Sequence, residues 1–156
     1  MRERLLRMVC VLPAIVIVGL LGGCAVAPNY EDVQSDTVSA AEQIIATFPE
    51  DSDVTKRPDS DPYACDSGGY LYTGQWDVTV PKGTDIAALI NALPDVLGED
   101  WVVTQGSLPR ADDYVDITDT ARKVGVSVSD TSSNYPAPTI NVYATSACAT
   151  LASSTP

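Results

Sequence analysis

Alternating apolar and polar residues predict five strands in this chain. The longest alternating run is YLYTGQWDVTV at 70–80, and shorter runs of the same period lie at 101–105, 114–118, 123–129 and 139–145. Because one face of each run is polar, we expect a mainly antiparallel sheet with its other face turned to the core. The side chains of 70–80 that we expect in the core are Tyr70, Tyr72, Trp76, Val78 and Val80.

Two segments show the three- and four-residue spacing of amphipathic helices. The first helix is predicted at 37–48, after a cap at Ser35 or Asp36 and before Pro49. The second is predicted from Thr84 or Asp85 to Leu97, with Gly98 at its exit and a kink or restart at Pro94, which cannot donate a hydrogen bond. The apolar positions of the two helices are Val38, Ala41, Ile45 and Phe48, then Ile86, Leu89, Ile90, Leu93 and Leu97.

The order of these elements is α, β, α, β, β, β, β. It predicts a two-layer α+β sandwich in which two helices cover one face of a five-stranded, mainly antiparallel sheet. We expect one domain at 35–150, preceded by a tether at 24–34 and followed by a frayed tail at 151–156. The Asp-, Ser- and Pro-rich segment 49–69 is predicted to be a long loop of a kind that is often functional or mobile.

The first residues have the features of a secretory signal. Three arginines precede a run of 14 uncharged residues that ends at Leu21, too short for the roughly 20 apolar residues that span a bilayer. Leu21-Gly22-Gly23-Cys24 resembles the lipobox of bacterial lipoproteins. The resemblance implies a signal peptide at 1–23, cleavage before Cys24, and a diacylglycerol on the Cys24 thiol. An uncleaved anchor, or a secreted protein with a chance cysteine, is the alternative.

Lipidation of Cys24 predicts a location on the outer face of the plasma membrane. The low Lys content beside abundant Ala, Asp, Thr and Val resembles the small lipoproteins of unknown function found in actinobacteria. That resemblance transfers no functional residues. In a Gram-negative host, Ala25 in place of an inner-membrane-retaining Asp would instead allow the outer membrane.

The excess of acidic over basic residues limits the classes of partner that the chain can bind. Nine Lys and Arg against 21 Asp and Glu give a formal net charge of −12, and loss of the signal, with three Arg and one Glu, leaves the mature chain at −14. Such a chain repels nucleic acid and anionic lipid headgroups, so we expect no nucleic-acid partner and membrane attachment through acyl chains alone. In an oxidising compartment, Cys65 and Cys148 are expected to form a disulfide, with two free thiols as the alternative.

One motif invites a catalytic interpretation. Asp66-Ser67-Gly68-Gly69 resembles part of the Gly-Asp-Ser-Gly-Gly-Pro signature of trypsin-like proteases, but the chain has no histidine to act as the general base for Ser67. No Ser-x-x-Lys motif replaces it. We therefore expect no catalytic role for Ser67 and read Gly68 and Gly69 as a turn that leads into the strand.

Oxygen ligands for a metal are plentiful but poorly spaced. The acidic runs at 51–62 and 110–119 lack the spacing of an EF-hand loop. Asp112, Asp113, Asp116 and Asp119 would converge only if their strand bent, so a solvated acidic surface is favoured. We expect no metal and no cofactor.

Tyr135 and Tyr143 are the candidate surface contacts, because Tyr135 lies in a predicted loop and Tyr143 on the polar side of the last strand. The sequence favours a non-enzymatic, lipid-anchored binding or accessory module whose partner is an envelope protein or a cell-wall component. A small envelope hydrolase that uses carboxylates alone is one alternative. A carrier of small ligands or lipids, with an apolar cavity between helices and sheet, is the other.

Overall fold

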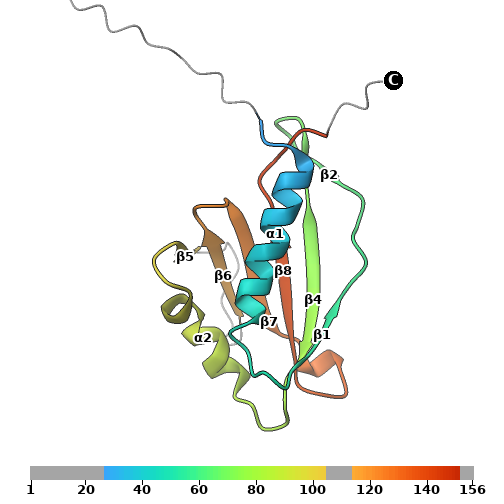
Figure 1. Ribbon diagram of the computed structural model, residues 1–156. Coiled ribbons are helices and arrows are strands. Elements are labelled where there is room, and N and C mark those ends of the chain that lie inside the picture. The colour runs from blue at the N-terminus through green and yellow to red at the C-terminus, as the bar shows by residue number, and fades with distance from the viewer. Residues whose placement is uncertain (1–26, 105–113, 152–156) are drawn as a thin grey trace, which may run out of the picture.

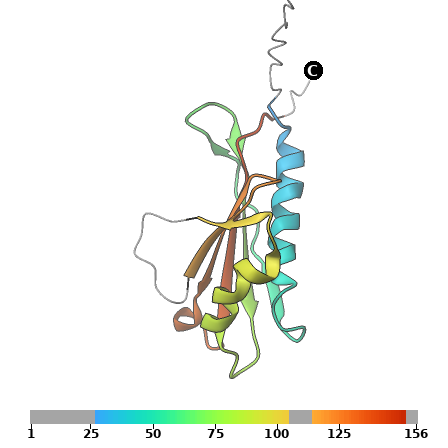
Figure 2. The ribbon, with the colours of Figure 1, turned by 90° about the vertical axis from the view of Figure 1, so that its left-hand side faces the viewer.

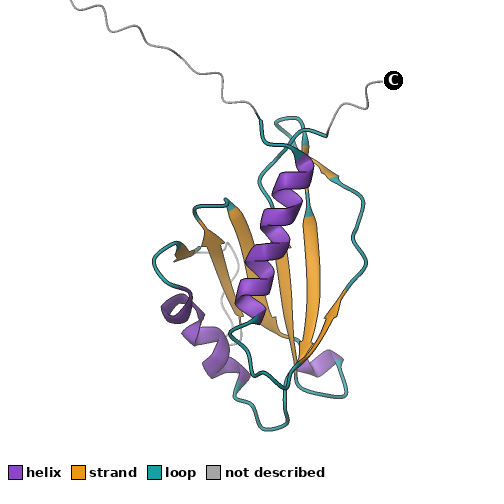
Figure 3. Cartoon of the chain, viewed as in Figure 1, coloured by secondary structure: helices purple, strands orange, loops and turns teal. Residues whose placement is uncertain are grey.

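Two helices cover one face of an antiparallel sheet in the computed structural model, which describes residues 27–104 and 114–151 (Figures 1 and 3). Figure 2 shows both helices on the same side of the sheet. The first helix, α1 (Tyr30–Ile45), packs against β4, β8 and β7, and the second, α2 (Ile86–Leu97), packs against β5, β6 and β7. This arrangement confirms the predicted α+β class with two helices on one face.

The sheet has six strands instead of five, in the order β1-β4-β8-β7-β6-β5, and all neighbours are antiparallel. The additional strand is β1 (Asp53–Lys56), which lies inside the predicted loop 49–69 and pairs with β4. All four residues of β1 are exposed, so the apolar alternation that marks the other strands is missing there. The other five strands are β4 (Thr73–Thr79), β5 (Trp101–Val103), β6 (Tyr114–Asp119), β7 (Val124–Asp130) and β8 (Thr139–Thr145).

The prediction for the first helix is wrong at both ends. α1 begins at Tyr30, so residues 30–34 belong to the helix and not to a tether. The Asn29 side chain caps it by accepting a hydrogen bond from the Glu31 N–H at 3.3 Å, and Glu31 suits the positive end of the helix dipole. The helix ends at Ile45, while Phe48 still packs into the core after it.

The second helix follows its prediction closely. The Asp85 side chain caps α2 by accepting from the Ala88 N–H at 3.0 Å. Pro94 lies inside the helix, and Gly98 leaves it with a φ of +89°. The helix directs Ile90 and Leu93, both at most 1% exposed, toward the sheet.

The core lies between the helices and the sheet. Alternate residues of β4, β6 and β7 are buried there, as the period of two predicts, whereas β8 buries residues 139–142 and Ala144. Trp76 and Val78 are buried, but Tyr70 is 37% exposed and lies in a separate short ribbon of β2 (Tyr63–Ala64) and β3 (Tyr70–Leu71). The run 70–80 is therefore two strands and not one.

A part-buried ion pair between Asp119 and Arg122 ties α1 to the turn between β6 and β7. Asp119 is 2% exposed and accepts from the Arg122 guanidinium as well as from the Ala121 and Arg122 N–H groups at 3.0 Å. The guanidinium also donates to Ser39 at 3.1 Å and to Gln43 at 2.6 Å on α1. Asp119 points toward the core side of β6, whereas Asp116 points to the other side.

The predicted disulfide is present between Cys65 and Cys148, with an S–S distance of 2.08 Å. It confirms that the segments flanking β4 and β8 are neighbours, and these two strands pair along their whole length. Gly68 and Gly69 have φ values of +88° and +83°, and a Cβ on Gly69 would lie 2.6 Å from the Ala149 carbonyl oxygen, so the turn requires glycine.

Both ends of the described chain lie at the pole that holds the disulfide (Figure 1). Asn29 forms a parallel bridge with Thr150, and the Tyr30 N–H donates to the Thr150 carbonyl at 2.9 Å. Between residues 27 and 151, outside the gap at 105–113, no helix has the length and apolar character needed to cross a bilayer. Cys24, the predicted signal 1–23 and residues 152–156 of the predicted tail lie outside the described residues.

Candidate functional site

The face of the sheet turned away from the helices, the open face, carries polar side chains from four adjacent strands. Strand register places Gln75 of β4, Tyr143 of β8, Ser127 of β7 and Asp116 of β6 in one row across it. Both α1 and α2 pack on the opposite face (Figure 2). The row follows from the period of two, because its members alternate with the buried residues of the same strands.

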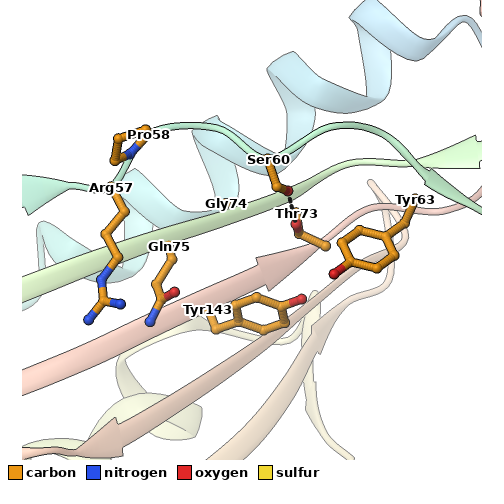
Figure 4. Close-up of a pocket in the computed structure, with 8 residues that line it drawn as sticks. All are labelled: Arg57, Pro58, Ser60, Tyr63, Thr73, Gly74, Gln75 and Tyr143. Carbon is orange, nitrogen blue, oxygen red and sulfur yellow. Dashed lines mark hydrogen bonds between the residues drawn. The ribbon is translucent and has the colours of Figure 1, made fainter.

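A hollow of about 340 Å³, the first hollow, lies at the β4 end of this row (Figure 4). One wall is the strap, residues 57–62, which runs from β1 to β2 across the edge of β4. Figure 4 shows Tyr63 and Tyr143 with their rings on the same side of β4 as the Gln75 side chain. The lining residues are Arg57, Pro58, Ser60, Tyr63, Thr73, Gly74, Gln75 and Tyr143.

Side-chain contacts fix the strap in place. The Asp59 carboxylate accepts from the Tyr72 hydroxyl at 2.7 Å and forms a 2.8 Å ion pair with Lys56. These two donors, Lys56 first, hold the pKa of Asp59 below its ordinary value. Farther along, the Ser60 and Thr73 hydroxyls lie 3.0 Å apart and share a hydrogen bond. The wall of the first hollow is therefore held to β4 by side-chain contacts.

A second hollow of about 200 Å³ lies on the other side of Tyr143, over β6 and β7. It is lined in part by Asp116, which accepts hydrogen bonds from the Tyr114 hydroxyl and, at 2.6 Å, from the Ser127 hydroxyl. Tyr143 lines both hollows and is 39% exposed, so its predicted exposure on the polar side of β8 is confirmed.

Tyr135 belongs to a bonded network beside the first hollow. Its hydroxyl accepts from Arg57 at 2.6 Å and donates to Asp77 at 3.1 Å. Arg57 also donates twice to the Asp77 carboxylate, at 2.8 and 3.2 Å, and the Asn141 amide donates to it at 2.9 Å. Tyr135 is half-buried, so it supports Arg57 more than it presents a free contact surface.

The Asp77 carboxylate is held in its ionised form. Partial burial raises its pKa, but donation by Arg57, Asn141 and Tyr135 outweighs burial and lowers the pKa below its ordinary value. An acceptor so fully bonded is suited to orient Arg57 and is poorly suited to donate a proton. This favours a structural role for Asp77 over general acid catalysis.

Carboxylates are not paired in either hollow. Among the described residues, none lines the first hollow and Asp116 alone lines the second. Asp116 and Asp119 point to opposite sides of β6, so the convergence considered for the acidic run does not occur between them, and Asp112 and Asp113 lie outside the described residues. No group of three or more His, Cys, Asp or Glu that could hold a metal occurs in 27–104 and 114–151.

Sequence reasoning found Tyr143 but missed the strap. Arg57, Ser60 and Tyr63 lie in a segment without periodicity, and only tertiary contacts bring them over β4. Ser67, in the protease-like tetrapeptide, lies in the turn between β2 and β3 and does not line the first hollow.

Comparisons with known proteins give one likeness in three-dimensional structure. No protein-family model matches the chain, and no curated protein matches it in sequence. The crystal structure of a DUF4853 family protein from Actinomyces odontolyticus ATCC 17982 superposes with a TM-score of 0.36 and 17% identity, over 81% of this chain and 67% of that one.

Proposed function

We propose that this protein is a lipid-anchored binding module on the outer face of the plasma membrane, and that its open face recognises a component of the cell envelope. The observation that supports this most is the pair of hollows that flank the exposed Tyr143 on a face without a helical cover. Concave sites with a few convergent polar groups are the usual form of ligand sites. The resemblance of its composition and of Leu21-Gly22-Gly23-Cys24 to those of small actinobacterial lipoproteins also supports the proposal.

The position of the N-terminus supports such an anchor. Cys24 is only three residues from Ala27, where the described fold begins, and this end lies at the disulfide pole (Figure 1). The strands of the sheet run away from that pole. An acylated Cys24 would thus hold the sheet end-on to the bilayer and leave the open face accessible from the side.

The two alternatives have less support. A hydrolase acting through carboxylates needs two of them about 5–9 Å apart around its substrate, and neither hollow is lined by such a pair among the described residues. A lipid carrier needs an apolar cavity between helices and sheet. That space is occupied by one cluster of buried side chains, among them Ile44, Ile90 and Val142, each fully buried. We therefore propose binding without catalysis.

Lipidation is tested by metabolic labelling. Cells that express the full chain are grown with an alkyne-tagged fatty acid, and the tagged chain is detected after solvent washing. We expect label on the wild type and none on Cys24→Ala, which should also leave the membrane fraction. Cys10 lies inside the predicted signal peptide, so Cys10→Ala is the matched control and should keep the label. An unlabelled wild-type chain in a soluble fraction would refute the anchor.

The binding face is tested by photo-crosslinking in the same cells. A benzophenone amino acid replaces Tyr143 on the open face or, as the control, Ala92 on the exposed side of α2. We expect a discrete envelope adduct from position 143 and much less from position 92. Equal yields at the two positions would contradict the assignment of the open face.

A further inference from the structure

The first hollow differs in charge from the rest of the chain. The protein carries a formal net charge of −12, yet no carboxylate of the described residues lines this hollow. Arg57, the one charged group among the described residues that line it, is matched by Asp77, which accepts two hydrogen bonds from it. The hollow is therefore close to neutral within an acidic molecule, and it favours a ligand without net charge.

Several polar groups around the first hollow have hydrogen-bonding capacity to spare. The Gln75 carboxamide and the hydroxyls of Tyr63 and Tyr143 make no hydrogen bond to another described residue. The Ser60 and Thr73 hydroxyls, which bond each other, can each still form a further hydrogen bond. Amides and hydroxyls both donate and accept. They match a ligand that itself carries many groups of both kinds.

Two aromatic rings border the same space. Tyr63 is 60% exposed and Tyr143 is 39% exposed, and both line the first hollow (Figure 4). The electron-rich face of an aromatic ring attracts the positively polarised edges of C–H groups. A pyranose ring offers such a C–H face together with hydroxyls at its rim, so it can use the tyrosines and Gln75 at once.

We propose that the first hollow binds a neutral saccharide of the cell envelope, packed on Tyr63 and Tyr143 and hydrogen-bonded by Gln75. The inference rests on the proposed function, because it names the ligand class for the open face. A folded protein partner typically buries about 800 Å² of an extended surface on each side. The first hollow is instead a small concave site of about 340 Å³. Phosphorylated polymers would meet the repulsion of the acidic chain.

The test is a titration of the isotope-labelled, lipidated chain in detergent, followed by its backbone amide NMR signals. The probes are triacetylchitotriose and maltotriose as neutral sugars, trigalacturonate as an anionic sugar, and tri-alanine as a peptide. We expect a neutral sugar to shift the amides of 73–75 and Tyr143 with a Kd of about 1 mM or lower. Trigalacturonate should bind at least about tenfold more weakly than that sugar.

Variants then locate the site. Tyr143→Ala should weaken binding of the neutral sugar about tenfold, as expected for the loss of one stacking ring, while Tyr143→Phe should retain most of it. Gln75→Ala is a second variant, which removes the proposed hydrogen bonds to the sugar and leaves both tyrosine rings in place. Tyr70→Ala is the matched control, because Tyr70 is 37% exposed but does not line the hollow, and it should bind as the wild type does.

Three results would overturn the proposal. One is that neither neutral sugar shifts these amides at about 10 mM, ten times the expected Kd. Another is that tri-alanine or trigalacturonate binds as tightly as the sugars, and the last is that Tyr70→Ala weakens binding as much as Tyr143→Ala. Each can occur while fatty-acid labelling and face-specific crosslinking still succeed, so failure here is distinguishable from failure of the proposed function.

Discussion

Removal of the disulfide should destabilise the protein mainly through its unfolded state. Cys65 and Cys148 are 83 residues apart, and closing a loop of that length contributes roughly 4.5 kcal/mol in the chain-entropy model. In the folded state Tyr70 and Ala149 still exchange two backbone hydrogen bonds of 2.8 Å beside the bridge. The double variant Cys65→Ser/Cys148→Ser should therefore keep its fold and lose about 4 kcal/mol of its unfolding free energy, a large part of the 5–15 kcal/mol typical of a domain.

Urea unfolding followed by tryptophan fluorescence measures this loss. Trp76 and Trp101 are 3% and 5% exposed, so both report the transfer of their indoles to water. The m-value should rise, because an unfolded chain without the cross-link exposes more surface. Replacing both cysteines avoids leaving one free thiol that could pair between molecules.

The control is Ser67→Ala, which lies in the same turn between β2 and β3 and leaves the bridge intact. It should change the unfolding free energy by less than about 0.5 kcal/mol, as surface substitutions usually do. The reasoning is refuted if the double variant loses less than about 1 kcal/mol, since the loop-closure term predicts several times more. An equal loss in the control would refute it as well.

Three further predictions concern stability. Asp119→Ala removes the acceptor of the part-buried guanidinium that ties α1 to the β6–β7 turn, and should cost about 1.5–3 kcal/mol in urea unfolding. An unchanged midpoint would contradict this. Gly74→Ala would place a Cβ 2.5 Å from the Trp76 ring and should cost about 1–3 kcal/mol, whereas Gly125→Ala, with open space around its Cβ, should cost little in the same assay. The pKa of Asp77 in the folded state lies below its ordinary 3.8, so its ionised carboxylate stabilises the fold above that pH and stops doing so as the pH falls through the folded value. In acid unfolding, the stability of Asp77→Asn should therefore decline less below about pH 4 than that of the wild type. Identical declines would exclude the contribution of Asp77.

Local sequence signals account for the elements that were predicted well. α2 combines the Asp85 cap with a regular apolar stripe, and β7 alternates between buried Val124, Val126 and Val128 and the half-buried residues between them. α1 was misplaced because its first turns carry mostly polar residues, and Val33 is their one apolar residue in the core. β1 was missed because an exposed edge strand has no core face to leave a pattern.

The residues of the candidate site also differ in whether a local sequence pattern predicts them. Tyr143 was predictable, since alternation along β8 assigns it to the face opposite the core. Arg57 and Tyr63 were not, because their positions depend on pairing of β1 with β4 and on the ion pair and hydrogen bonds of the strap. Those contacts join residues that no local pattern relates.

The bridge between Asn29 and Thr150 has a practical consequence for work in cells. If Cys24 is acylated as proposed, a fluorescent reporter fused after Leu151 would start from the same pole as the anchor and be crowded against the bilayer. An epitope inserted at Asn134, which is exposed in the connection between β7 and β8, would instead start from the end of the sheet opposite that pole, within reach of antibodies.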